Sequence, residues 1–259
     1  YLNYGMLSNV NREGQIAGSR VDVAPFKKDP ADFVLWKPSN ENQPGWESPW
    51  GFGRPGWHTE CSAMSKKTLG LPFDIHGGGK DLTFPHHENE IAQSCCSSGD
   101  IENPNSYANY WMHNGFVTIN GEKMSKSLGN IILVKDLSEK YHGEVIRLAL
   151  LSSHYRQGLD WNDQVAHQAK KLLDKLYKIL EDLSDTINKE SKNISPDFIA
   201  SLMDDLNTPG FLANLNKLIK DFDLIKTEED RSIFKSKLIL CGEILGILQE
   251  EPSSWFNEE

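Results

Sequence analysis

A short polar segment near the middle of the chain carries the residue types that bind phosphate. Residues 122–130 read Glu-Lys-Met-Ser-Lys-Ser-Leu-Gly-Asn and so place lysines, serines and a Gly-Asn exit together. Lysine ammonium groups act as mobile point charges on phosphoryl oxygens, while serine hydroxyls and free backbone N–H groups add donors. The glycine lets the backbone approach a bound nucleotide. A solvated basic turn after a hairpin is the alternative, and it is the usual explanation of a lone K-x-x-K.

A second set of residues could hold a metal ion. His86 and Glu90 are four residues apart on an expected helix, so their side chains project from one face and can bind one ion. With Cys61 as a third ligand, a thiolate, an imidazole and a carboxylate form a set typical of zinc, with one position left open for a substrate. Spacing alone leaves two alternatives: a surface pair of His86 and Glu90, or His87 in place of His86.

The run of glycines after the expected strand at 73–76 marks a third candidate site. Open α/β sheets bind ligands at the carboxyl ends of their strands, where backbone must come close to the ligand. Gly78 and Asp81 are therefore candidates for a supporting nucleotide or substrate role. A tight turn is the usual explanation of three glycines in a row.

Three segments keep the order and spacing of one known family. They are residues 55–64 (Pro-Gly-Trp-His-Thr-Glu-Cys-Ser-Ala-Met), residues 73–82 (Phe-Asp-Ile-His-Gly-Gly-Gly-Lys-Asp-Leu) and residues 84–90 (Phe-Pro-His-His-Glu-Asn-Glu). K-M-S-K-S followed by L-G-N is the signature loop of class I aminoacyl-tRNA synthetases. Taken together, the four segments resemble cysteinyl-tRNA synthetases, and the resemblance runs from about Tyr4 to about Pro252.

The resemblance implies a role for each candidate residue. Zinc is held by Cys61, His86 and Glu90, together with one cysteine from the part of the family's fold that precedes these motifs. Trp57 borders the cysteine pocket, for which a core tryptophan is the alternative. A satisfied structural histidine remains the alternative for each histidine taken singly. The implied ATP contacts are Lys123, Met124, Ser125, Lys126, Ser127, Gly78 and Asp81, and the implied substrate contacts are Trp57, His76, His87 and His113.

The resemblance also implies a reaction and its partners. The carboxylate of L-cysteine attacks the α-phosphate of Mg-ATP, and the cysteinyl group then passes from the adenylate to tRNA(Cys). Lys126 is expected to make the stronger phosphate contact and Lys123 the second, with both acting by positioning and charge neutralisation. Two other functions stay open: a cysteine ligase of the mycothiol pathway, which transfers cysteine to an amino-sugar, and a non-catalytic module that binds zinc or RNA.

The composition of the chain limits the partners and the cellular location that can be expected. The 259 residues carry a net charge of -10, with 37 acidic against 27 basic side chains, which argues against broad electrostatic capture of nucleic acid. A tRNA partner therefore enters only through the resemblance. No apolar run has the length of a membrane span and no signal-type start is visible, so we expect a cytoplasmic monomer that does not bind membranes. The cysteines form no regular disulfide framework and are expected to be reduced: Cys61, Cys95, Cys96 and Cys241.

No H-x-G-H segment occurs in the sequence. In class I synthetases this segment lies in the first half of the nucleotide-binding fold. We therefore expect the sequence to correspond to the second half of a Rossmann-type catalytic domain and a helical domain after it, without the family's small C-terminal piece. We expect the isolated chain not to catalyse ATP–pyrophosphate exchange.

The elements that position these residues change in type along the chain. The predicted fold class is α/β followed by α, with a Rossmann-type half-domain at 1–134 and a helical bundle at 135–259. In the first part we expect strands at 32–37, 73–76 and 111–119, helices at 58–69 and 85–97, and a turn at Asn120 and Gly121. In the second part, apolar residues recur at helical spacing from Val145 to Leu183, a break follows at 206–209, and two amphipathic helices are expected at 209–222 and 228–248.

Overall fold

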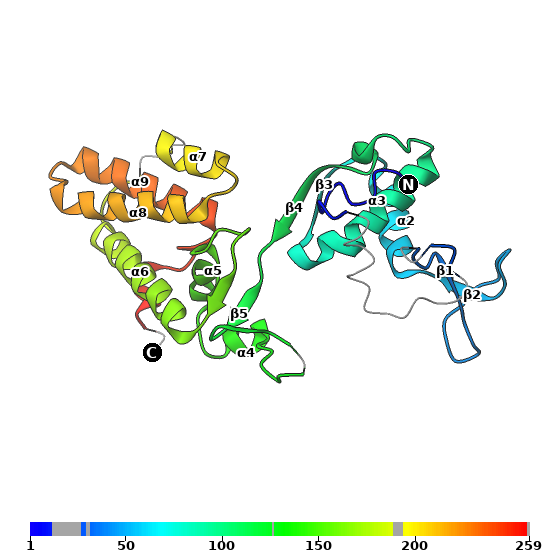
Figure 1. Ribbon diagram of the computed structural model, residues 1–259. Helices are drawn as coiled ribbons and strands as arrows, with labels where there is room; N and C mark the ends of the chain where they lie inside the picture. The colour runs from blue at the N-terminus through cyan, green and yellow to red at the C-terminus, as the bar shows by residue number, and fades with distance from the viewer. Residues whose placement is uncertain (12–26, 30–31, 126, 189–193, 258–259) are drawn as a thin grey trace. The chain divides into compact units, whose positions relative to one another are not determined.

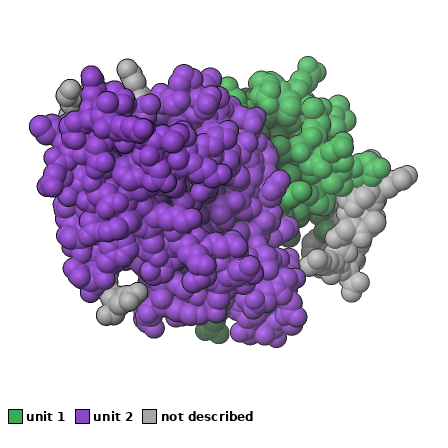
Figure 2. Space-filling model, turned by 90° about the vertical axis from the view of Figure 1, so that its left-hand side faces the viewer, with its two compact units in different colours: residues 1–114 green, residues 115–259 purple. Residues whose placement is uncertain are grey.

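The computed structural model describes residues 1–11, 27–29, 32–125, 127–188 and 194–257. Lys126, the predicted stronger ATP contact, lies outside the described residues. The chain divides into two compact units, Tyr1–Asn114 and Gly115–Glu259 (Figure 2). The domain boundary predicted near Lys135 falls within the second unit and stays a prediction.

The first unit contains two parallel strands joined through a helix (Figure 1). β3 (Phe73–Gly79) pairs with β4 (Ala108–Asn114), and α3 (Glu88–Ser98) lies between them in the sequence. Parallel strands need such a crossover, so this is an α/β unit of the expected kind. α2 (Trp57–Leu69) packs beside α3. The buried core of this unit consists of Phe73, Ile91, Cys95, Tyr107 and Ala108.

One predicted boundary in this unit is wrong. The strand expected to end at His76 continues to Gly79, because the glycines pair with β4 through their backbones. The helix expected from Pro85 is confirmed: it begins in a π-helical turn over Thr83–His87, which is interrupted at Phe84, and continues as α3 from Glu88. Phe84 is extended, with φ −132° and ψ 131°, as expected for a residue whose α conformation is disfavoured by a following proline. His86 therefore lies in the π-helical turn that leads into the helix carrying Glu90.

A buried carboxylate fixes the N-terminal segment to α3. Glu88 is fully buried and accepts hydrogen bonds from Gly5 N at 2.9 Å, Ser8 N at 2.7 Å and Ser8 Oγ at 2.9 Å. The strand expected at 32–37 is shorter than predicted. It forms as β1 (Trp36–Pro38), paired antiparallel with β2 (Gly53–Pro55).

The second unit begins with a small sheet. β5 (Val117–Ile119) pairs antiparallel with β6 (Glu122–Lys123) and parallel with β7 (Leu159–Trp161). The single strand predicted at 111–119 is wrong, since it divides into β4 and β5. At the division the backbone of Gly115 passes so close to Gln157 that a Cβ would lie 2.2 Å from the Gln157 carbonyl oxygen. The predicted turn is confirmed by φ of 50° at Asn120 and 80° at Gly121, as in a type I′ hairpin.

Helices make up the rest of the second unit (Figure 1). The two helices predicted after the break are confirmed as α8 and α9, and Asn207 caps α8 by accepting from Gly210 N at 2.9 Å. Among the described residues, no helix combines the length and the apolar composition that crossing a bilayer requires. The helices are α4 (Val134–Ser138), α5 (Gly143–Leu151), α6 (Asp163–Asp182), α7 (Pro196–Met203), α8 (Thr208–Asp221), α9 (Glu228–Leu245) and α10 (Pro252–Trp255).

Candidate metal centre and phosphate-binding loop

Three metal-ligating side chains converge in the first unit. His76 comes from β3, His87 from the turn before α3, and Glu90 from the first turn of α3. One ligand atom of each lies within 4.8 Å of the others, and His76 Nε2 lies 3.3 Å from Glu90 Oε2. His87 and Glu90 are buried, at 3% and 4% exposure. Two imidazoles and one carboxylate match the donor set of a catalytic zinc site with an open position.

Aromatic side chains surround this group. The Tyr107 hydroxyl donates to Glu90 Oε2 at 3.2 Å, and Nε2 of His113 lies 2.9 Å from Nδ1 of His87. The Trp111 ring centroid is 4.8 Å from that of His76 and 5.2 Å from that of His87. Hydrogen bonds and ring contacts of this kind fix the orientation and tautomer of ligating imidazoles.

The electrostatics of the group suit a cation. Burial raises the pKa of Glu90 to about 7, while hydrogen bonds from Tyr107 and Cys61 oppose the rise. Burial, followed by the neighbouring histidines, lowers the pKa of His87 to about 3, and burial also lowers the pKa of His76. Both imidazoles are therefore neutral near pH 7 and offer lone pairs. A divalent ion would supply the positive charge that the buried carboxylate lacks, so the donors fit a metal.

The predicted ligands Cys61 and His86 lie around this group. The thiol of Cys61 interacts with Glu90, and its pKa is raised, first by burial and then by the charge of Glu90. Nδ1 of His86 lies 2.9 Å from Nε2 of His58. The described residues thus gather His76, His87 and Glu90 as a trio that could hold a metal ion, and the set Cys61, His86 and Glu90 stays a prediction. Glu90 belongs to both sets.

Three predicted pocket residues have clear positions in the first unit. Trp57 is 77% exposed, so the alternative of a core tryptophan is wrong. Its ring centroid is 6.5 Å from that of His86. A Cβ on Gly78 would lie 2.9 Å from Cε1 and 3.1 Å from Nε2 of His87, so the absence of a side chain at this position makes room for that imidazole. A Cβ on Gly79 would lie 2.5 Å from the carboxylate of Asp81, which folds back over the strand end.

The lysine loop belongs to the second unit, where β6 leads into it. Lys123 Nζ lies 5.2 Å from the ring centroid of Phe116, in a cation–π contact. Ser125 Oγ is 3.2 Å from Ser127 Oγ and accepts from Leu128 N at 3.3 Å. Lys123 and Ser127 are exposed, whereas Met124 and Ser125 are half-buried. The predicted ATP roles of these residues stay predictions.

Comparison with known proteins decides the family. Residues 1–171 match the model of the "tRNA synthetases class I (C) catalytic domain". The chain belongs to this family of class I synthetases. Residues 197–249 of the synthetase match a second model, the DALR domain. The predicted order of a mixed α/β region followed by a helical region is confirmed.

Curated relatives extend the match to nearly the whole chain. The synthetase is 54% identical over 257 residues to a "Cysteine--tRNA ligase" of Parvibaculum lavamentivorans, covering 99% of this chain and 54% of the relative. It is 51% identical over 252 residues to a "Cysteine--tRNA ligase" of Rhodospirillum rubrum, covering 97% and 54%. The resemblance to cysteinyl-tRNA synthetases is confirmed. The chain spans about half the length of the curated relatives it matches.

Among solved structures, the chain resembles a LeuRS in its fold. The ternary complex of Agrobacterium radiobacter LeuRS with tRNA and LeuAMS aligns with a TM-score of 0.60 at 15% identity, covering 82% of this chain and 34% of that chain.

Sequence reasoning did not place His76 and His87 with Glu90 in one group that could hold a metal ion. It assigned both histidines to substrate binding, which stays a prediction, and it did not select Tyr107 or Trp111. The parallel pairing of β3 with β4 brings His76 opposite Trp111. If the expected strands at 73–76 and 111–119 had been paired in parallel, the sequence would have placed Trp111 beside His76.

Proposed function

We propose that the protein to which this chain belongs is a cysteine–tRNA ligase, which activates L-cysteine with ATP and transfers it to tRNA(Cys). The observation that carries this proposal is the identity of 54% to a "Cysteine--tRNA ligase" along nearly the entire chain. The group of half-buried His76 and buried His87 and Glu90, with the Cys61 thiol beside it, supports a thiol-selective site.

Selection of the amino acid is proposed to depend on Glu90. Glu90 belongs both to the trio of gathered side chains and to the set implied by the resemblance, so we assign it as a ligand in either case. A zinc ion bound there would take a cysteine thiolate as a further ligand, which serine's less acidic hydroxyl supplies poorly; a contact of this type can discriminate by roughly 10⁴ to 10⁵. Exposed Trp57 is proposed to border the amino acid, and His113 to orient His87.

Activation is proposed to depend on the lysine loop. Lys123 and Lys126 are assigned to the phosphates of ATP, and Met124, Ser125 and Ser127 are assigned as further ATP contacts of the loop. Gly78 and Asp81 of the first unit are assigned a supporting nucleotide role. The Lys123 ammonium is exposed, and its contact with Phe116 is one that phosphate oxygens could replace. Positioning and charge neutralisation are sufficient roles, because transfer of a nucleotidyl group requires little acid–base chemistry from the protein.

The amino-sugar ligase and the non-catalytic module are the other candidates. The identity to relatives named "Cysteine--tRNA ligase" supports a tRNA partner over an amino-sugar. The same preparation of the full-length gene product can test all three. Cysteine-dependent ATP–pyrophosphate exchange together with acylation of tRNA(Cys) is the expected result. Exchange without tRNA acylation but with amino-sugar acylation would favour the second candidate, and no exchange would overturn the enzyme assignment.

A further inference from the structure

One asparagine closes the lysine loop onto itself. Asn130 Oδ1 accepts a hydrogen bond from Ser125 N at 2.9 Å, and Asn130 Nδ2 donates to the carbonyl oxygen of Lys123 at 3.2 Å. A single side-chain amide therefore joins the residue that ends the loop to the main chain at its beginning. Gly129 makes the closure possible, because its φ of 66° turns the chain back in a conformation that glycine adopts readily.

The entrance to the loop is fixed separately. Asp160 on β7 accepts from Gly121 N at 2.6 Å and from Thr118 Oγ1 at 2.7 Å, and so anchors the turn between β5 and β6. These bonds stabilise the ionised carboxylate and lower the pKa of Asp160, first through the Gly121 amide. Asp160 thus fixes the chain before Lys123. The position of the Lys123 main chain then depends on contacts from the residues that follow it, and Asn130 makes such a contact with the Lys123 carbonyl oxygen.

The atoms that Asn130 contacts indicate a role in positioning the loop and not in binding the substrate. Among the described residues, the side chain of Asn130 bonds main-chain atoms of Lys123 and Ser125 and no side-chain atoms. It therefore orients the two residues without occupying the Lys123 ammonium or the Ser125 hydroxyl. The Ser125 N–H is already donated to Asn130, so the contact leaves Ser125 its side chain to act on phosphate.

We propose that Asn130 is a positioning residue for activation of the amino acid. It holds the main chain of Lys123 and Ser125 so that the Lys123 ammonium is presented to the phosphates of ATP as the adenylate forms. The inference rests on the proposed function and adds a residue that acts through Lys123. Transfer from the adenylate to tRNA involves no leaving pyrophosphate and should not depend on this contact.

The test measures the two half-reactions separately in the full-length gene product. Asn130→Ala removes both hydrogen bonds from a half-buried surface position. We expect the loss of these two neutral hydrogen bonds to raise the activation barrier, so that the rate of adenylate formation falls by roughly 10-fold to 30-fold. The single-turnover rate of transfer from preformed adenylate to tRNA should change less than about twofold, which lies within 0.5 kcal/mol.

A double-mutant cycle then asks whether Asn130 acts through Lys123. Lys123→Ala alone should slow activation, and adding Asn130→Ala in that background should have little further effect. Asn216→Ala is the matched control, since in the part of the chain that the structure describes its side-chain amide donates to Leu212 O of its own helix, at 3.0 Å, and to no other group. It should leave both half-reactions unchanged.

The results that would overturn the inference differ from those that would overturn the proposed function. Full activation by Asn130→Ala, equal losses in both half-reactions, or additive effects of Asn130→Ala and Lys123→Ala would refute the positioning role. An unchanged rate of amide exchange at Ser125 N in Asn130→Ala would refute the loop closure, and this readout needs no activity. A wild-type protein without any exchange of pyrophosphate would instead refute the ligase assignment.

Discussion

Glu144 offers the sharpest test of how the second unit is held together. Its buried carboxylate accepts from Leu248 N and Gln249 N at 2.8 Å each, and the Tyr177 hydroxyl lies 3.0 Å from both of its oxygens. The N-terminus of α5 is thereby tied to α6 and to the segment after α9. Glu144→Ala would leave two main-chain donors and one hydroxyl without their acceptor.

The size of the effect can be worked out from these contacts. A hydrogen bond to a charged group contributes about 1.5 to 3 kcal/mol, and a buried donor left unpaired costs about 1 to 3 kcal/mol. The two amides are only partly buried, so water offsets part of the loss. We expect Glu144→Ala to reduce the free energy of unfolding of the second unit by about 2 to 4 kcal/mol.

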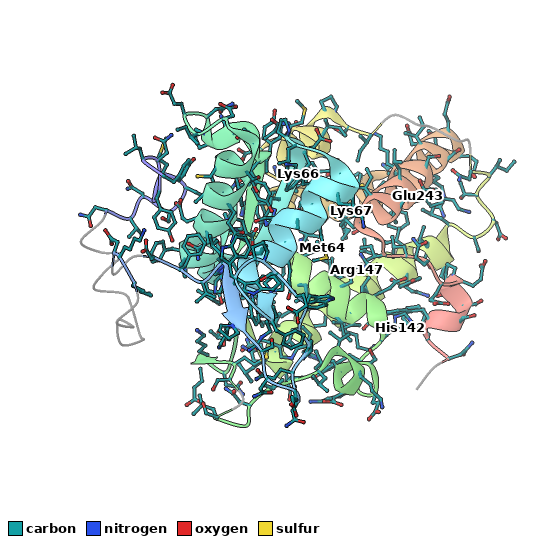
Figure 3. All side chains as sticks on the ribbon, turned by 90° about the vertical axis from the view of Figure 1, so that its right-hand side faces the viewer. Met64, Lys66, Lys67, His142, Arg147 and Glu243 are labelled. Atoms are coloured by element: carbon teal, nitrogen blue, oxygen red, sulfur yellow. The ribbon has the colours of Figure 1, made fainter. Side chains whose placement is uncertain are left out.

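Urea denaturation followed by tryptophan fluorescence provides the assay. Trp255 stacks on Tyr177 with ring centroids 4.3 Å apart, so its emission reports on this region. Glu243→Ala is the control, because Glu243 is exposed on α9 (Figure 3), and it should remain within about 0.5 kcal/mol of the wild type. A loss below about 1 kcal/mol for Glu144→Ala would refute the reasoning.

Three further predictions concern single contacts. Lys235→Met removes an ammonium that donates to Leu183 O at 2.8 Å and Thr186 O at 2.9 Å beyond the end of α6, so the free energy of unfolding should fall by about 1 to 2 kcal/mol; an unchanged urea midpoint would contradict this. Gly78→Ala should displace the His87 ring and weaken zinc binding by roughly 10-fold, as measured by competition with a chelator; unchanged affinity would count against His87 as a ligand. Glu88→Ala should speed amide hydrogen exchange at Gly5 and Ser8, and protection equal to wild type would disprove the anchoring role of Glu88.

Local sequence signals predicted the helical half well. The break expected at 206–209 falls at the start of α8, where Asn207 caps the helix and Pro209 lies in its first turn. The apolar spacing after Thr227 gave α9 to within a few residues. The Asn-Gly turn that delivers Lys123 was equally local, since both residues adopt positive φ.

The group of His76, His87 and Glu90 could not be predicted to the same degree because it depends on long-range packing. Helical spacing paired His86 with Glu90, and His86 lies in the π-helical turn that leads into α3, so that pairing stays a prediction. His76 joins Glu90 only when β3 runs beside α3, at a separation of 14 residues along the chain that no periodicity encodes. The Asn130 closure likewise requires the left-handed Gly129, which the sequence permits but does not specify.

The most direct test of the account is the zinc content of the full-length protein and of its Glu90→Gln variant, measured by mass spectrometry after gel filtration. Glu90 belongs to every ligand set considered, whereas exposed Glu60 belongs to none and provides the control Glu60→Gln. We expect one zinc per chain in the wild type and the control, and a loss of most of it in Glu90→Gln. A wild-type protein without zinc, or a Glu90→Gln variant that keeps its full content, would contradict the claim that this group selects cysteine through a metal.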